Sequence, residues 1–359
     1  MVKYPFYIKS TVVLFGLILF VYALSNLREV MVPLAFSLLL AILLNPVANW
    51  LEGKKMPQVV SIIFSMLLAF IVIGAILYFI SFQIESFKTE LPLLKKKFIE
   101  LFNHSQQTIQ HSFGVSIQQQ QQYIDNAKAA LKPFIGATIG TIFGSLAIVV
   151  LLPVYTFLFL FYKKLMLNFL FEVFADKNSK EVGVVLQQTK GAIQNYMVGL
   201  LLEGLAVAIL NSVALMLLGL KYAILLGVLG AIVNVLPYLG GILAILFPVI
   251  IATVTKEGYH TQLGILISYI IIQFIDNHFL IPVIVSSRVK INALISIVIV
   301  LLGGILWGIP GMFLSIPFIG VLKIVFDRIP ELQAWGKLLG DEVPTRHKGE
   351  KIVKRSKIA

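Results

Sequence analysis

The sequence predicts an all-α polytopic membrane protein with about eight transmembrane segments, two of them broken or re-entrant, and an amphipathic helical insertion outside the membrane. Of its 359 residues 58% are hydrophobic and 13% are charged, whereas soluble domains average about 45–50% and about 25%. Apolar stretches of the roughly 20 residues that cross a bilayer recur along the chain. Two of the last stretches carry glycine and proline at their centres.

The apolar stretches can be placed in order, the sixth and the eighth being the interrupted ones. They cover residues 11–27, 30–51, 59–82, 135–162, 198–218, 222–254, 262–285 and 291–326. We therefore divide the chain into transmembrane helices 1 to 3 (1–82), an extramembrane helical domain (83–134), transmembrane helix 4 (135–162), a cytoplasmic amphipathic connector (163–197), a C-terminal core with the broken helices (198–328) and a basic cytoplasmic tail (329–359).

The region after the third apolar stretch is too polar to lie in the membrane. Apolar side chains return there every three or four positions, as at Phe87, Leu91, Leu94 and Phe98, with lysine and glutamine on the opposite face. This spacing is typical of amphipathic helices, and we expect two of them with a break near Gly114.

The net charge of +12 reflects membrane topology better than nucleic-acid binding. Many of the basic residues flank the apolar stretches, and such flanks orient a membrane protein. They predict that both termini, the loop at Gly53 and the connector are cytoplasmic and that residues 83–134 lie on the opposite, outer side of the membrane. The flanking residues include Lys3, Lys9, Lys54, Lys55, Lys163, Lys164, Lys323 and Arg328.

Several chemistries are excluded by residue type or spacing. The chain has no cysteine, which excludes disulfides, cysteine-ligated zinc, iron–sulfur clusters and thiol catalysis. It also has no HExxH motif, no Gly-x-Ser-x-Gly elbow and no phosphate-binding Gly-rich loop. We therefore expect neither an enzyme nor a cofactor or metal site, and any driving force must come from an ion gradient or a partner.

Helix-incompatible residues interrupt the sixth and eighth stretches at the depth where a bilayer demands an unbroken helix. Paired interruptions of this kind are a sequence pointer to a transporter's binding site, because the freed backbone groups can hydrogen-bond a polar solute. The first break contains Asn234, Pro237, Tyr238, Gly240 and Gly241, and the second contains Gly303, Gly304, Gly308, Pro310, Gly311 and Pro317.

Glu203 and Asp276 are the only ionisable residues well inside the apolar stretches. Gln273, Asp276 and Asn277 have i, i+3, i+4 spacing, which predicts one polar stripe on a helix. A charged carboxylate at mid-bilayer costs about 2.5 kcal/mol or more, so each group should be protonated, paired or facing water. Intramembrane carboxyls of this kind are candidates for ion or substrate binding.

Structural roles remain open for both carboxyls. Asp276 could cap a broken helix or pair with Arg288, and Glu203 could make an interhelical hydrogen bond or meet a partner at a subunit interface.

The residues around the two breaks resemble the AI-2E family of bacterial transporters, which is named for autoinducer-2 export. The resemblance rests on Asn234-x-x-Pro237-Tyr238-x-Gly240, on Gln273-x-x-Asp276-Asn277 with Pro282, and on the glycines of the second break with Pro317. It implies an eight-helix inner-membrane protein that forms a homo-oligomer, with a pentamer as one expected assembly. Three positions depart from the family pattern: Gly241 replaces a proline, Val283 a basic residue and Asn292-Ala293 a His-Pro pair.

Family members are described both as autoinducer-2 exporters and as Na⁺(Li⁺)/H⁺ antiporters, so the resemblance leaves the substrate open. Our first hypothesis is secondary transport of a small polar solute or signal outward, with Asp276 as the group that responds to a proton or cation. The second is a Na⁺(Li⁺)/H⁺ antiporter that uses Asp276 and Glu203. The third, from another class, is a non-transporting oligomeric scaffold or channel that acts through residues 83–134.

Overall fold

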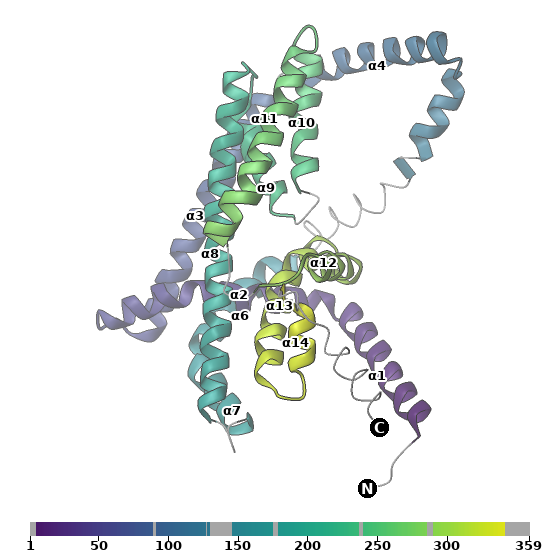
Figure 1. Cartoon of the computed structure of the whole chain (residues 1–359). Coiled ribbons are helices and arrows are strands. Elements are labelled where there is room, and N and C mark those ends of the chain that lie inside the picture. Colours follow the sequence, from purple (N-terminus) through teal and green to yellow (C-terminus); the bar gives the residue numbers. More distant parts are fainter. Residues whose placement is uncertain are drawn as a thin grey trace, which may run out of the picture.

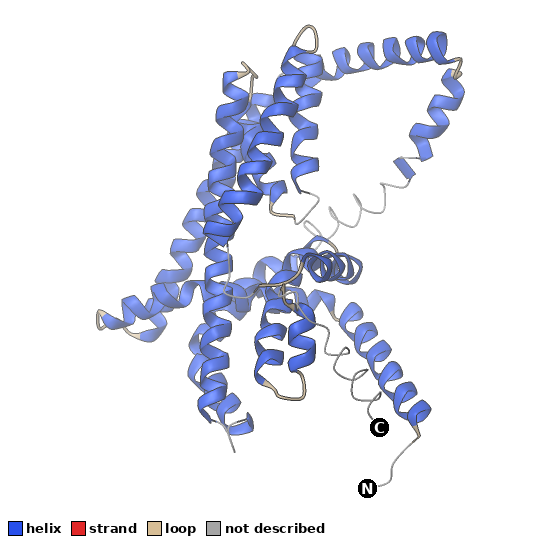
Figure 2. Ribbon diagram, viewed as in Figure 1, coloured by secondary structure: helices blue, strands red, loops and turns tan. Residues whose placement is uncertain are grey.

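The computed structural model describes residues 5–88, 91–126, 128–129, 146–174, 179–236, 240–285 and 290–341. Within these ranges the regular structure is entirely helical (Figures 1 and 2). The helices are α1 (Phe6–Asn26), α2 (Arg28–Gly53), α3 (Gln58–Lys88), α4 (Leu91–Phe113), α6 (Leu146–Phe161), α7 (Lys163–Phe174), α8 (Ser179–Leu217), α9 (Ala223–Asn234), α10 (Gly240–Thr255), α11 (His260–Ile275), the π-helical η1 (Asp276–Val285), α12 (Ala293–Trp307), α13 (Ile309–Arg328) and α14 (Gln333–Leu339).

Among the described residues, five helices are long and apolar enough to cross a bilayer: α2, α3, α8, α11 continued by η1, and α13. A sixth results if α6 and α7, which meet at a bend of 64°, are counted as one broken span. The apolar helices α1, α9, α10 and α12 are shorter. The predicted class, an all-α polytopic membrane protein, is confirmed, while the number of crossings stays a prediction.

Helix α8 is the longest of the described helices and extends from the upper to the lower part of the view in Figure 1. Its 39 residues rise about 58 Å at 1.5 Å per residue, well beyond the roughly 30 Å of a hydrocarbon core. The helix continues without a break across residue 198, where we expected the connector to give way to a span. One end of this single helix must therefore project from the membrane.

The first interrupted segment is a helical hairpin. Gly240 lies against Asn234, because a Cβ on Gly240 would meet the Cα of Asn234 at 2.5 Å, and Gly230 faces Ala244 further along the same two helices. Helices α9 and α10 are thus antiparallel. The 12 residues of α9 rise only about 18 Å, which is shorter than the roughly 30 Å of a hydrocarbon core, so α9 is too short to cross a bilayer by itself.

The second interrupted segment also turns back on itself. The hydroxyl of Ser315 in α13 donates to the carbonyl of Ile299 in α12 at 2.9 Å. A Cβ on Gly303 would lie 2.5 Å from the carbonyl oxygen of Gly311, so the two backbones are in direct contact. Gly308 between the helices has φ +68°, a backbone region that glycine adopts without steric cost.

A hydrophobic core unites the end of α8 with α9, α10 and α11. Its fully buried members include Leu215, Ala252 and Ile265. Leu94 of α4 joins this core, and the ring of Phe87 packs edge-on against that of Tyr222 at 5.2 Å. The start of the polar insertion is therefore fixed against the turn between α8 and α9.

Two further cores join other described helices. One joins α2, α8 and α13 around Leu39, Ile193 and Leu314, and the other joins α2, α3 and α6 around Ile62 and Leu160. Helix α2 contributes to both cores. The predicted fourth span, 135–162, overlaps α6, and its residues 135–145 lie outside the described part of the chain.

Candidate functional site

Three polar side chains from three helices meet beside the tip of the first hairpin. The side-chain amide of Asn234, the last residue of α9, donates to Oδ2 of Asp276 at 3.0 Å and to Oε1 of Glu203 at 3.3 Å. Glu203 comes from the middle of α8, and Asp276 from the point where α11 passes into η1. One amide group therefore bridges two carboxyl groups that lie 73 positions apart in the sequence.

Local sequence explains why each side chain reaches this point. Glycine at position 240 lets α10 start directly against the end of α9, where any Cβ would collide with the Asn234 backbone. At Asp276 the α-helix widens into the π-helix η1, which contains Pro282. Proline has no backbone N–H to donate, and π-helical turns are rare and concentrate at functional sites.

Both carboxyl groups are buried. Asp276 is 1% exposed and Glu203 is 5% exposed. The side-chain amide of Asn234 donates to one oxygen of each carboxyl, so the two acids lie close to the same group. Oδ1 of Asp276 has no hydrogen-bond partner among the described residues.

This arrangement favours the binding of positive charge or of a hydrogen-bond donor. Two negative charges held together in a low-dielectric interior repel each other, and each loses its hydration. A proton, a monovalent cation or a hydroxyl-bearing solute would relieve that cost. The free Oδ1 of Asp276 is an acceptor for such a group.

The other residues of the predicted polar stripe divide into two groups. The amide of Gln273 lies against the start of α10, where a Cβ on Gly241 would meet its Cδ at 2.9 Å. The side chain of Asn277 is exposed, since one further residue turns it away from the carboxyl pair. Of the first break, Pro237 and Tyr238 lie outside the described residues.

The glycines of the second break lie within their own hairpin. The groups next to Gly304 belong to Met312, and those next to Gly311 belong to Gly303 and Trp307. Gly308 forms the turn. These contacts explain the glycines as packing residues of α12 and α13, and their part in a binding site stays a prediction.

Two further buried polar side chains lie on the same helices as the carboxyl pair: Asn211, which sequence reasoning assigned to packing or hydrogen bonding, and Tyr269, which it missed. Both are buried, and they lie on either side of Gly230: a Cβ there would be 3.3 Å from the amide nitrogen of Asn211 and 3.5 Å from the Tyr269 hydroxyl. The spacing of Asn211 from Glu203, eight residues along one helix, was a signal that could have revealed it.

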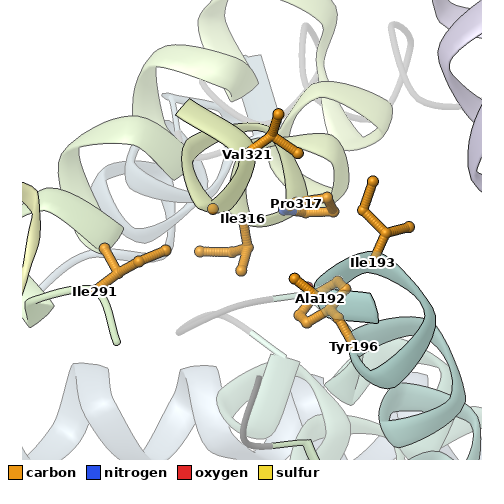
Figure 3. A pocket seen from close by; sticks show the side chains of 8 residues that line it. Ala192, Ile193, Tyr196, Ile291, Ile316, Pro317 and Val321 are labelled. Carbon is orange, nitrogen blue, oxygen red and sulfur yellow. The ribbon is translucent and has the colours of Figure 1, made fainter. Parts of the chain in front are cut away.

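A small pocket opens elsewhere, between α8 and α13 (Figure 3). It is lined by Ala192, Ile193, Tyr196, Ile291, Ile316, Pro317, Gly320 and Val321. The lining is almost wholly apolar, and Tyr196 is its one residue with a polar side-chain atom. The carboxyl pair, rather than this pocket, carries the polar chemistry.

Comparison with known proteins gives matches that agree with one another and cover most of the chain. A family model described as "AI-2E family transporter" matches residues 10–331. The chain is 25% identical to the "Putative transport protein YrrI" of Bacillus subtilis over 83% of this chain and 86% of the relative. It is 21% identical to the "AI-2 transport protein TqsA" of Escherichia coli over 93% of this chain and 96% of that protein.

Proposed function

The chain belongs to the AI-2E family of transporters, and from that premise we propose that it is a secondary transporter that exports a small polar solute or signalling molecule, such as autoinducer-2, across the bacterial inner membrane. The observation that carries the proposal is the buried pair of carboxyls joined by Asn234. TqsA of Escherichia coli, named as an AI-2 transport protein, makes autoinducer-2 the first solute to test.

The position of the pair supports a transport role over a structural one. Apolar side chains would pack at this position with a smaller free-energy cost, because removing two ionised acids from water costs several kcal/mol per ion before any favourable contacts are counted. Here Glu203 and Asp276 lie beside the tip of the α9–α10 hairpin, and Asp276 is the first residue of a π-helix. Broken helices of this kind form the central binding sites of secondary transporters.

The hydrogen bonds suggest how solute and proton compete. With a proton shared by the two acids, Asn234 joins α8, α9 and η1 through its single amide. A solute hydroxyl that donates to the free Oδ1 of Asp276 would compete with the shared proton for that carboxyl. Solute binding and proton release are then coupled through the same few atoms.

A second candidate function, Na⁺(Li⁺)/H⁺ antiport, is favoured by the same oxygen atoms. Carboxylate and amide oxygens are ligands for hard cations. If the amide of Asn234 turned by 180°, it would present its oxygen beside Glu203 and Asp276, and a cation could replace the proton. Cation-stimulated proton release from proteoliposomes distinguishes this candidate from solute export.

Two contacts support the orientation that we propose, with both termini in the cytoplasm. Lys163 bonds to Asn49 at 2.7 Å and to Glu52 at 3.4 Å, so the loop after α2 and the start of α7 share one side. On the opposite end of α8, Phe87 and Tyr222 pair the insertion with the α8–α9 turn. The hairpin α9–α10 then enters from outside.

The test is flux in proteoliposomes that contain the wild-type protein or the Asp276→Asn variant, with autoinducer-2, Na⁺ and Li⁺ as probes under an imposed pH gradient. We expect solute flux in the wild type and its loss in the variant. Glu257→Gln removes an exposed carboxylate from the turn between α10 and α11 and is the matched control. Equal flux in Asp276→Asn and wild type would refute the assignment of Asp276, and no flux for any probe would refute the proposed function.

A further inference from the structure

Asn211 of α8 and Tyr269 of α11 form a second buried polar group outside the carboxyl pair. Asn211 is 2% exposed and Tyr269 is 7% exposed. Neither the Oδ1 of Asn211 nor the Tyr269 hydroxyl has a hydrogen-bond partner among the described residues. Buried polar atoms in native proteins are nearly always paired, with protein or with water.

The amide nitrogen of Asn211 and the hydroxyl of Tyr269 lie close to the same position on α9. Gly230 of α9 lies between them, and its missing side chain leaves only van der Waals distance to each: 3.3 Å to the Asn211 amide nitrogen and 3.5 Å to the Tyr269 oxygen, measured from an added Cβ. The next contact of that Cβ is Ala244 at 3.5 Å. Small residues on α9 and α10 therefore keep this polar point free of bulky side chains.

The group is aligned with the carboxyl pair on all three helices. Asn211 follows Glu203 by eight residues, and Tyr269 precedes Asp276 by seven, which is about two turns in each case and preserves the helix face. Gly230 precedes Asn234 by four residues, or about one turn. Helices α8 and α11 are antiparallel, so a later residue on α8 and an earlier residue on α11 are displaced in the same direction. Asn211, Gly230 and Tyr269 therefore all lie between the carboxyl pair and the α8–α9 turn.

Water is the occupant that fits these atoms. A water molecule can donate to Asn211 and accept from the tyrosine hydroxyl, and polar buried sites of this kind hold water whereas apolar ones stay dry. We propose that Asn211 and Tyr269 form a hydrated station on the transport path, between the carboxyl pair and the end of the bundle at the α8–α9 turn. The inference rests on the proposed function for the direction of the path.

The absence of cysteine from the sequence makes the test direct. Asn211→Cys and Tyr269→Cys are each exposed to a charged, water-soluble thiol reagent, which reacts with the thiolate and so requires water at the site. The matched control is Ile209→Cys, two residues away on α8. Its side chain is 54% exposed on the outer surface of the helix bundle, which faces lipid and not water in a membrane-spanning helix. A positive control is Glu257→Cys in the turn between α10 and α11.

We expect labelling at positions 211 and 269 to be at least about tenfold faster than at position 209, because only hydrated thiols ionise readily. Adding Gly230→Leu, whose side chain fills the space between Asn211 and Tyr269, should abolish the labelling of Asn211→Cys, whereas Gly204→Leu, at an open position on α8, should leave it unchanged. Monodisperse elution and helical circular dichroism establish that each variant is folded.

The proposal of a hydrated station is refuted if the cysteines at positions 211 and 269 react no faster than the cysteine at position 209 while Glu257→Cys reacts. Labelling needs no transported solute, so its failure is separate from that of the proposed function. Rapid labelling without flux of any probe would refute solute export but support the hydrated station. Flux without rapid labelling would support solute export but refute the hydrated station.

Discussion

The contact between the two helices of the second hairpin gives a prediction whose size follows from the structure. Gly303 of α12 and Gly311 of α13 touch backbone to backbone, and a Cβ added to Gly311 would lie 2.7 Å from the carbonyl carbon of Gly303 and 3.0 Å from Cβ of Trp307. Neither contact is with the far end of a flexible side chain. The substitution Gly311→Ala must therefore push the two helices apart.

The expected cost is that of overpacking a well-packed core, about 1–3 kcal/mol. Separation of the helices would also lengthen the hydrogen bond from Ser315 to Ile299, which is 2.9 Å long. The matched control is Gly320→Ala on the same helix, where an added Cβ meets nothing within 4 Å. Alanine is the better helix former, so this control should gain up to about 1 kcal/mol.

Thermal unfolding in detergent, followed by intrinsic fluorescence and by size-exclusion chromatography, measures the difference. We expect Gly311→Ala to lower the midpoint by about 2–12 °C, at about 2–4 °C per kcal/mol. Gly320→Ala should match or exceed the wild type. If the two alanine variants unfold at the same temperature, the helices do not approach as closely as the structure has them, and the explanation of these glycines fails.

Three further predictions concern single side chains. Asn234→Leu removes the shared donor, so we expect a loss of about 1–3 kcal/mol for the two unpaired acids together with loss of flux in proteoliposomes; a variant with normal flux would contradict the bridging role. Asn292→Ala removes the cap of α12 and the bonds to the carbonyls that end α14, and thermal unfolding should show a cost of about 1–2 kcal/mol, against none for the exposed Asn277→Ala. Leu215→Ala, at a fully buried position, should cost about 2–5 kcal/mol, whereas Leu217→Ala, at a residue that is 84% exposed, should unfold as the wild type does.

The fold class could be predicted from the sequence because apolar length and spacing are local properties. The position of the breaks was also predictable, since glycine and proline act on their own backbone. Whether a broken segment crosses or turns back depends on contacts such as that of Gly230 with Ala244. Those contacts arise only when the chain folds, so the two hairpins could not be deduced.

The candidate site likewise has residues that the local sequence predicts and residues that only the tertiary contacts reveal. Glu203 and Asp276 stand out as acids in apolar surroundings, but nothing local indicates that Asn234 joins them, because the three side chains come from three helices. Asn277 has the right spacing for the polar stripe, yet it lies in the π-helix η1, where the α-helical spacing no longer holds, and its side chain is exposed. Asn211 and Tyr269 resemble ordinary packing residues in the sequence, and only their unpaired atoms distinguish them.

The short length of α9 bears on how the protein is made. The 12 residues of α9 are too few to cross a bilayer and cannot rest stably in lipid by themselves. They need α8 on one side and α11 on the other, and α11 leaves the ribosome only after the whole hairpin has been synthesised. Entry of this hairpin into the membrane is therefore a late, post-translocational step, and a nascent chain truncated before His260 should keep residues 223–255 at the bilayer surface.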